Sequence, residues 1–76
     1  MITVKIYGLL RIESGVKEKQ LKAGTVKEVL ESLAACGLSR KNLDGCIILI
    51  NGKSAGKRNK LSDGDTVILM SPVAGG

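Results

Sequence analysis

The sequence predicts an α+β domain in which a mixed sheet of four to five strands packs one face against one main helix. Three observations lead to this prediction. Apolar residues alternate with others at the start of the chain, recur at helical spacing in its middle, and form two short runs in its second half. A helix with one apolar stripe needs an apolar surface to pack on, and one face of a sheet supplies it.

The first strand is expected over residues 2–10, where the residues divide between two faces. Successive side chains of a strand point to opposite sides, so one face should be buried and the other should point away from the helix. The buried set is predicted to be Ile2, Val4, Ile6 and Leu10, and the outward set Thr3, Lys5, Tyr7 and Leu9. Turn-forming residues follow, and a more polar second strand over about 16–22 completes an N-terminal hairpin.

The main helix is predicted to begin at Thr25, which has the spacing of a capping box with Glu28. Gly37 is well placed to end the helix in a left-handed conformation. The apolar stripe that should face the sheet consists of Val26, Val29, Leu30 and Leu33.

The second half of the chain contains the remaining strands. Residues 38–45 form a polar connection with one short helical turn, and the apolar run over 46–50 is the next strand. Asn51 and Gly52 are typical of a type I′ hairpin turn, which leads to a short strand near 53–55. The last strand is predicted over Thr66–Met70.

The resulting element order, β-β-α-β-(β)-β, is that of a β-grasp fold. We expect one domain over residues 1–70 and a flexible C-terminal Gly-Gly tail over 71–76.

Composition limits the function further. No apolar run approaches the roughly 18 residues of a membrane span, and the N-terminus does not resemble a signal peptide, so we expect a cytoplasmic protein. The chain has two cysteines and no histidine, which is a poor donor set for a metal site and leaves no imidazole to activate a thiol. We therefore expect no metal, no bound cofactor, no catalytic residue, and two buried structural thiols, Cys36 and Cys46.

The net charge is +5, and one basic cluster lies at Lys53, Lys57, Arg58 and Lys60. Such a cluster attracts nucleic acid or an acidic protein face. Single-strand binders also need aromatic stacking platforms, and Tyr7 is the only aromatic residue in the chain. We interpret the cluster as a solvated loop and do not expect nucleic acid as the partner.

The C-terminal segment carries the functional signal. Pro72 is expected to stop the last strand, because it has no backbone N–H and restricts the residue before it. Gly75 and Gly76 then remove all side-chain bulk around the terminal carboxylate. The segment over 72–76 is therefore predicted to be a narrow strip that enters a slot in another protein.

Two motifs resemble a known family. Leu61-Ser62-Asp63-Gly64-Asp65-Thr66-Val67 and Pro72-Val73-Ala74-Gly75-Gly76 are similar to the MoaD-like small subunit of molybdopterin synthase and its ubiquitin-like sulfur-carrier relatives of the MoaD/ThiS family. The opening Tyr7-Gly8-Leu9-Leu10-Arg11 also resembles that family. Met70 stands where the family often has Phe, and Ser71 stands where a second proline is common.

The resemblance implies a non-catalytic sulfur carrier. An E1-like adenylyltransferase of the MoeB/ThiF type would use ATP to adenylylate the Gly76 carboxylate, and sulfur would then replace AMP to leave a thiocarboxylate. A large synthase subunit of the MoaE type would take that sulfur for molybdopterin. The tail that threads into the partner's site would comprise Pro72, Val73, Ala74 and Gly75.

The strand alternation also predicts a docking surface on the outer sheet face. We expect an apolar patch that leads to the tail and binds the partners in turn, formed by Tyr7, Leu9, Ile47, Leu49, Ile68 and Met70. Three alternatives stay open: a sulfur carrier for thiamine or tRNA thiolation, a ubiquitin-like modifier conjugated to lysines through Gly76, and a β-grasp interaction module in which the Gly-Gly end is incidental.

Overall fold

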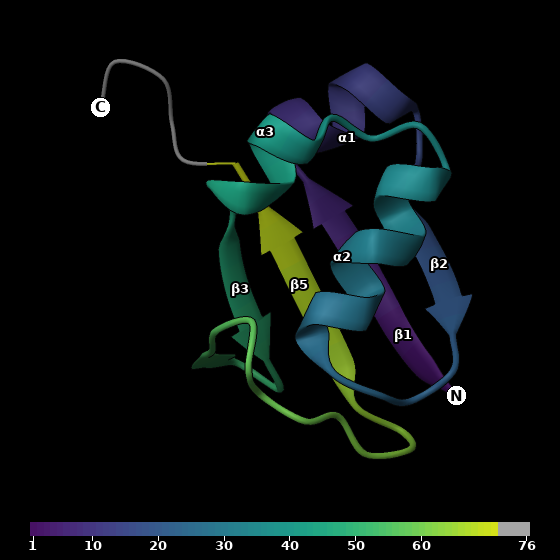
Figure 1. The fold of residues 1–76 in the computed structure, drawn as a ribbon, viewed down its shortest axis with the longest axis vertical. Helices are drawn as coiled ribbons and strands as arrows, with labels where there is room; N and C mark the ends of the chain where they lie inside the picture. Colours follow the sequence, from purple (N-terminus) through teal and green to yellow (C-terminus); the bar gives the residue numbers. More distant parts are fainter. Residues whose placement is uncertain (72–76) are drawn as a thin grey trace.

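A computed structural model describes residues 1–71 of the chain. It contains one five-stranded sheet with the strand order β2-β1-β5-β3-β4 (Figure 1). The strands are β1 (Ile2–Tyr7), β2 (Glu18–Leu21), β3 (Ile47–Ile50), β4 (Lys53–Ser54) and β5 (Thr66–Met70). The helices are α1 (Leu9–Ser14), α2 (Val26–Ala35) and α3 (Arg40–Asp44).

The sheet is mixed because its first and last strands lie side by side. β1 and β5 pair in parallel, with Thr3 opposite Thr66 and Tyr7 opposite Met70. β2 adds to β1 antiparallel, while β3 pairs antiparallel with both β5 and β4. The predicted β-grasp fold with one main helix is confirmed, and the sheet has the larger of the two expected strand numbers.

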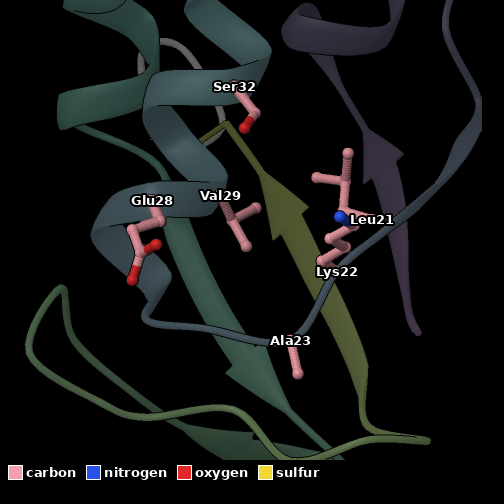
Figure 2. A pocket seen from close by; sticks show the side chains of 6 residues that line it. All are labelled: Leu21, Lys22, Ala23, Glu28, Val29 and Ser32. Atoms are coloured by element: carbon pink, nitrogen blue, oxygen red, sulfur yellow. The ribbon is translucent and has the colours of Figure 1, made fainter.

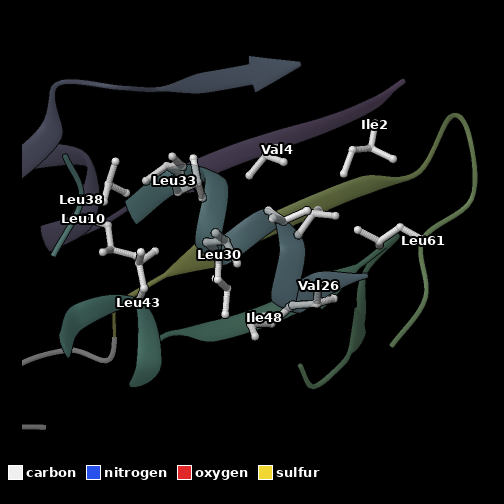
Figure 3. Close-up of a cluster of buried hydrophobic side chains, with 14 residues drawn as sticks. Ile2, Val4, Leu10, Val26, Leu30, Leu33, Leu38, Leu43, Ile48 and Leu61 are labelled. Atoms are coloured by element: carbon white, nitrogen blue, oxygen red, sulfur yellow. The ribbon is translucent and has the colours of Figure 1, made fainter. Parts of the chain in front are cut away.

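The core lies between α2 and one face of the sheet (Figure 3). The predicted stripe of α2 is buried in full, as is the predicted inward set of the first strand, and Val67 and Leu69 of β5 are buried with them. α1 and α3 close the end of the core where β5 finishes, and each contributes one buried leucine, Leu10 and Leu43. The buried cluster consists of Ile2, Val4, Ile6, Leu10, Val26, Val29, Leu30, Leu33, Leu38, Leu43, Ile48, Leu61, Val67 and Leu69.

Both predicted ends of α2 are confirmed. The Thr25 hydroxyl accepts a hydrogen bond from the Glu28 N–H at 3.2 Å, and the Glu28 carboxylate accepts one from the Thr25 N–H at 3.1 Å. At the other end Gly37 has φ 104°, and the Leu38 N–H bonds back to the Leu33 carbonyl at 3.2 Å. This bond, with the one from the Gly37 N–H to the Ala34 carbonyl, completes a Schellman motif.

The predicted N-terminal hairpin needs correction. β1 ends at Tyr7, and residues 9–14 form the short helix α1 instead of continuing the strand to residue 10. The break occurs at Gly8, whose φ of 72° and ψ of −145° lie in a region that only glycine adopts without strain. Leu10 is buried as expected, but from a helix, and the second strand is shorter than the predicted 16–22.

The hairpin between β3 and β4 matches its prediction. Asn51 and Gly52 both have positive φ, 50° and 84°, as a type I′ turn requires. The Asn51 side chain also accepts a hydrogen bond from the Thr66 N–H and donates one to Asp65, both at 3.0 Å. This turn therefore holds the start of β5 in place.

Asp65 is the second anchor at the start of β5. Its carboxylate accepts hydrogen bonds from the Ser62 N–H at 2.8 Å and from the Asn51 amide. These bonds favour the ionised form, so the pKa of Asp65 lies below its ordinary value of 3.8.

The capping box gives a first prediction. Replacing Thr25 by Ala removes the hydroxyl that accepts from Glu28, and the free energy of unfolding should fall by about 1 kcal/mol. Urea denaturation measures the change. Ser32→Ala on the exposed side of the same helix is the matched control and should leave the midpoint nearly unchanged. Equal loss in both variants would contradict the assigned cap.

The Asp65 anchor gives a second prediction. A carboxyl whose pKa is lowered by folding stabilises the protein above its unfolded pKa, and this contribution is lost as pH falls through the folded value. The urea midpoint of the wild type should therefore decline as the pH falls toward and below the ordinary carboxyl pKa of 3.8. Asp65→Asn should flatten that decline, whereas Asp44→Asn, which makes the same change of charge elsewhere, should leave it steep.

Candidate functional site

The C-terminal segment leaves the domain from the middle of the sheet. β5 lies between β1 and β3 and is hydrogen-bonded to both along its length. Figure 1 shows its C-terminal end beside α1 and α3, away from the loop that follows β4. A central strand is the most constrained place in a small sheet, so the position and direction of the chain at Met70 are well defined.

Ser71, the last described residue, is held by the turn between β1 and α1. Its Oγ accepts a hydrogen bond from the Leu10 N–H at 3.1 Å. Leu10 lies in the first turn of α1, where backbone N–H groups have no partner within the helix, and Gly8 at the N-cap has no side chain to supply one. Ser71 therefore provides the helix cap from the far end of the sequence.

Ser71 can approach the start of α1 this closely because residue 8 is a glycine. A Cβ built at Gly8 would lie 3.1 Å from the Ser71 Oγ and 3.4 Å from the Ser71 backbone nitrogen. Such distances are shorter than ordinary van der Waals contact, and the positive φ of Gly8 disfavours a side chain independently. Gly8 and Ser71 together determine where the chain leaves the sheet.

The sheet face opposite α2 carries the predicted apolar patch. The register places Tyr7, Met70 and Ile47 in one row across β1, β5 and β3. The next row consists of Lys5, Ile68 and Leu49. Tyr7 and Ile47 are 41% and 43% exposed, while Leu49, Ile68 and Met70 are half-buried. These five side chains, which we call the outer apolar face, lie next to the position where β5 ends.

Leu9, the remaining residue of the predicted patch, lies in α1 and not in the sheet. It was expected on the outward face of a continuous first strand, but it lies in the first turn of α1 and is 49% exposed. The prediction missed Ile12, three residues further along α1, which is 79% exposed. Residues at this spacing share one side of a helix, so α1 carries an exposed apolar surface of its own. The sequence feature that could have indicated this surface is Ile12 itself, an apolar residue in a segment that was interpreted as a turn.

The two thiols differ from their prediction. Cys36 is exposed, at the C-cap of α2, and its Sγ accepts a hydrogen bond from the Lys19 ammonium. The expectation of burial is wrong here because Cys36 lies at the C-terminal end of α2 near the edge strand β2, where it is exposed and reaches Lys19. Cys46 is half-buried, and this burial raises the pKa of its thiol.

Other predicted features lie partly outside the described structure. Pro72, Val73, Ala74, Gly75 and Gly76 are not among the described residues. Within residues 1–71, no group of three or more His, Cys, Asp or Glu side chains is arranged to hold a metal ion. No helix in this part of the chain has the length and apolar character needed to cross a membrane.

Two solved structures resemble the chain closely in fold. Small archaeal modifier protein 1 from Methanosarcina acetivorans superimposes with a TM-score of 0.82 at 28% identity, covering 99% of this chain and 95% of that one. A chain from the complex of subunits 1 and 2 of molybdopterin-converting factor from Helicobacter pylori gives a TM-score of 0.74 at 26% identity, covering 99% and 97%.

A third likeness is to another protein complex. A chain of the BexX/CysO complex from Amycolatopsis orientalis gives a TM-score of 0.71 at 26% identity and full coverage of both chains. A comparison with curated protein sequences gives no match. The family model of the ThiS family matches residues 4–76, which include both the sheet and the Gly-Gly end. This chain therefore belongs to the ThiS family of small ubiquitin-like sulfur carriers and modifiers.

Proposed function

We propose that the chain carries sulfur on the carboxylate of Gly76 for molybdopterin synthesis. The observation that carries the proposal is the outer apolar face beside Ser71, at the point where the chain leaves the centre of the sheet. The likeness to a chain of the Helicobacter pylori molybdopterin-converting factor complex supports the choice of pathway. The chain would act as the non-catalytic small subunit of the synthase.

The chemistry requires activation by a partner. A carboxylate oxygen of Gly76 attacks the α-phosphorus of ATP on an E1-like adenylyltransferase, pyrophosphate leaves, and an acyl adenylate forms. A sulfide then attacks the acyl carbon and AMP leaves, which produces the thiocarboxylate. Where the sulfur arrives as a persulfide, a second thiol must cleave the S–S bond by forming a disulfide with the donor. The domain supplies neither nucleotide nor base in these steps.

The contribution of this chain is presentation. The β5 ladder and the Ser71 contact set the origin of the tail, so the tail's glycines start from a defined point relative to the outer apolar face. A partner that binds this face receives Gly76 in its own closed site, where water is kept from the reactive acyl group. The same face would serve the activating enzyme and the synthase large subunit in succession.

A second function is favoured by the likeness to small archaeal modifier protein 1. In that case the activated Gly76 would form an isopeptide bond with a lysine of another protein, and an amine would replace sulfide as the nucleophile that displaces the leaving group. The two functions share the activation step and separate only after it. A carrier for thiamine or tRNA thiolation would share the thiocarboxylate as well.

The first test is the intact mass of the chain after incubation with ATP, an E1-like enzyme of the same source and sulfide. A gain of about 16 Da, the exchange of oxygen for sulfur, is expected if an acyl intermediate is trapped by sulfur. A chain lacking Gly75 and Gly76 should gain nothing. Adducts to cell proteins without the mass gain would favour the modifier function, and no reaction with an enzyme active on another carrier would contradict both.

The second test concerns the docking face. Ile68→Asp places a charge in the middle of the outer apolar face, and we expect the Kd for a synthase large subunit to rise at least about tenfold. Gln20→Asp is the matched control, because it puts the same charge on the same sheet face outside the patch. Urea denaturation must show that both variants unfold cooperatively. If both variants bind the large subunit with the same Kd, the outer apolar face is not the docking surface.

A further inference from the structure

β2 leaves one side of the sheet open. Among residues 1–71, it is the edge strand and pairs only with β1. The Ile6 N–H donates to the Lys17 carbonyl at 2.9 Å, so this pair and every second pair along the ladder exchange hydrogen bonds. By this alternation, the backbone N–H and C=O groups of Glu18 and Gln20 point away from β1, toward the open edge.

A hollow lies between this edge strand and α2. Its volume is about 270 Å³, and Figure 2 shows it between the end of β2 and the first turns of the helix. Leu21 and Val29 give it an apolar floor, and Ser32 lies on its helix side (Figure 2). A strand added to the β2 edge would alternate its side chains, so every second one would point toward this hollow.

The charge around the edge is mostly positive. Residues 16–22 carry three lysines, Lys17, Lys19 and Lys22, against one acid, Glu18. Glu28 also lines the hollow, but its carboxylate already accepts from the Thr25 N–H and hydroxyl, both at 3.1 Å. These donors are neutral, so Glu28 keeps its negative charge, and the three lysines outnumber the two acids by one.

We propose that the β2 edge and the hollow beside α2 bind an extended acidic peptide by strand addition. Its main chain would bond to Glu18 and Gln20, aliphatic side chains at alternate positions would fill the hollow over Leu21 and Val29, and flanking carboxylates would meet the lysines. This inference is independent of the proposed function, because the β2 edge shares no residue with the outer apolar face.

A second copy of this chain is a poorer occupant. Two β2 edges paired antiparallel would bring their lysine-rich strands together, and like charges placed opposite each other destabilise a sheet. Lysines on an edge strand also prevent uncontrolled self-pairing. Lysines alone would be enough to protect the edge from self-pairing. The hollow with its apolar floor is an additional feature, and it favours a peptide over a second copy as the occupant.

The test uses the full chain and a fluorescein-labelled probe of sequence Asp-Asp-Ile-Thr-Ile-Thr-Ile-Asp-Asp. Anisotropy should show saturable binding, and amide shifts in NMR spectra should concentrate on residues 18–22 and 28–32. A probe with Pro in place of the central Ile should not bind, because it lacks a main-chain donor. Shifts confined to the outer apolar face, or no saturation, would overturn the proposal.

Glu18→Pro separates backbone pairing from charge attraction. It removes an outward N–H at a position where an edge strand tolerates proline, and it makes the edge more positive. Strand addition predicts at least about tenfold weaker binding, whereas charge attraction alone predicts tighter binding. Slow hydrogen exchange of the Ile6 amide, which bonds to Lys17, will show that the β1–β2 ladder is intact.

A charge pair completes the design. Lys22→Glu, at the hollow, should weaken binding of the probe severalfold, while Lys53→Glu, on β4 at the opposite edge of the sheet, should not. Equal losses would mean that the probe responds only to net charge. Sedimentation of the unliganded chain tests whether a second copy occupies the edge. A wild-type dimer that dissociates in the Glu18→Pro variant would assign this edge to a second copy and overturn the proposal.

Discussion

The parallel pairing of β1 with β5 is the contact on which the rest of the molecule depends. It joins residues 3–7 to residues 66–70 and places the last strand in the centre of the sheet. Without it, the sheet would divide into the two-stranded β1–β2 unit and the three-stranded β5-β3-β4 unit, and an isolated two-stranded hairpin is marginally stable in water. α2 packs across both halves only because this pair holds them in one sheet.

This pairing also explains how a small domain displays a terminal segment. Main-chain hydrogen bonds on both sides hold β5 up to Met70, and the Ser71 hydroxyl then caps α1. The outward side chains of β1, β5 and β3 face the same side at this end. The end of β5 and the outer apolar face are thus held by the same pairings of β5 with its two neighbours. Changes in the register of β5 would move both together.

Much of this arrangement could be predicted from local pattern. The α2 stripe, its capping box, the Asn51-Gly52 turn and the limits of β5 depend on neighbouring residues, and each was found where expected. The division of side chains between the two faces also held over residues 2–7 of β1, because alternation is a property of any strand.

The parts that were missed depend on contacts between distant residues. Leu9 and Leu10 fit the alternation of a strand as well as the turn of a helix, so only the conformation of Gly8 decides between them. That conformation is coupled to Ser71, more than 60 positions away, and no local pattern contains this contact. Ile12 was overlooked for the same reason, since a segment interpreted as a turn has no predicted faces.

The central position of β5 has a mechanical consequence. A partner that grips the segment after Met70 and pulls on it applies force along the strand axis, with hydrogen-bonded neighbours on both sides. The bonds to β1 and β3 are then loaded together in shear, and they must yield as a group instead of opening one after another from an edge. The sheet therefore resists a pull on the end of β5 more strongly than it would if β5 were an edge strand.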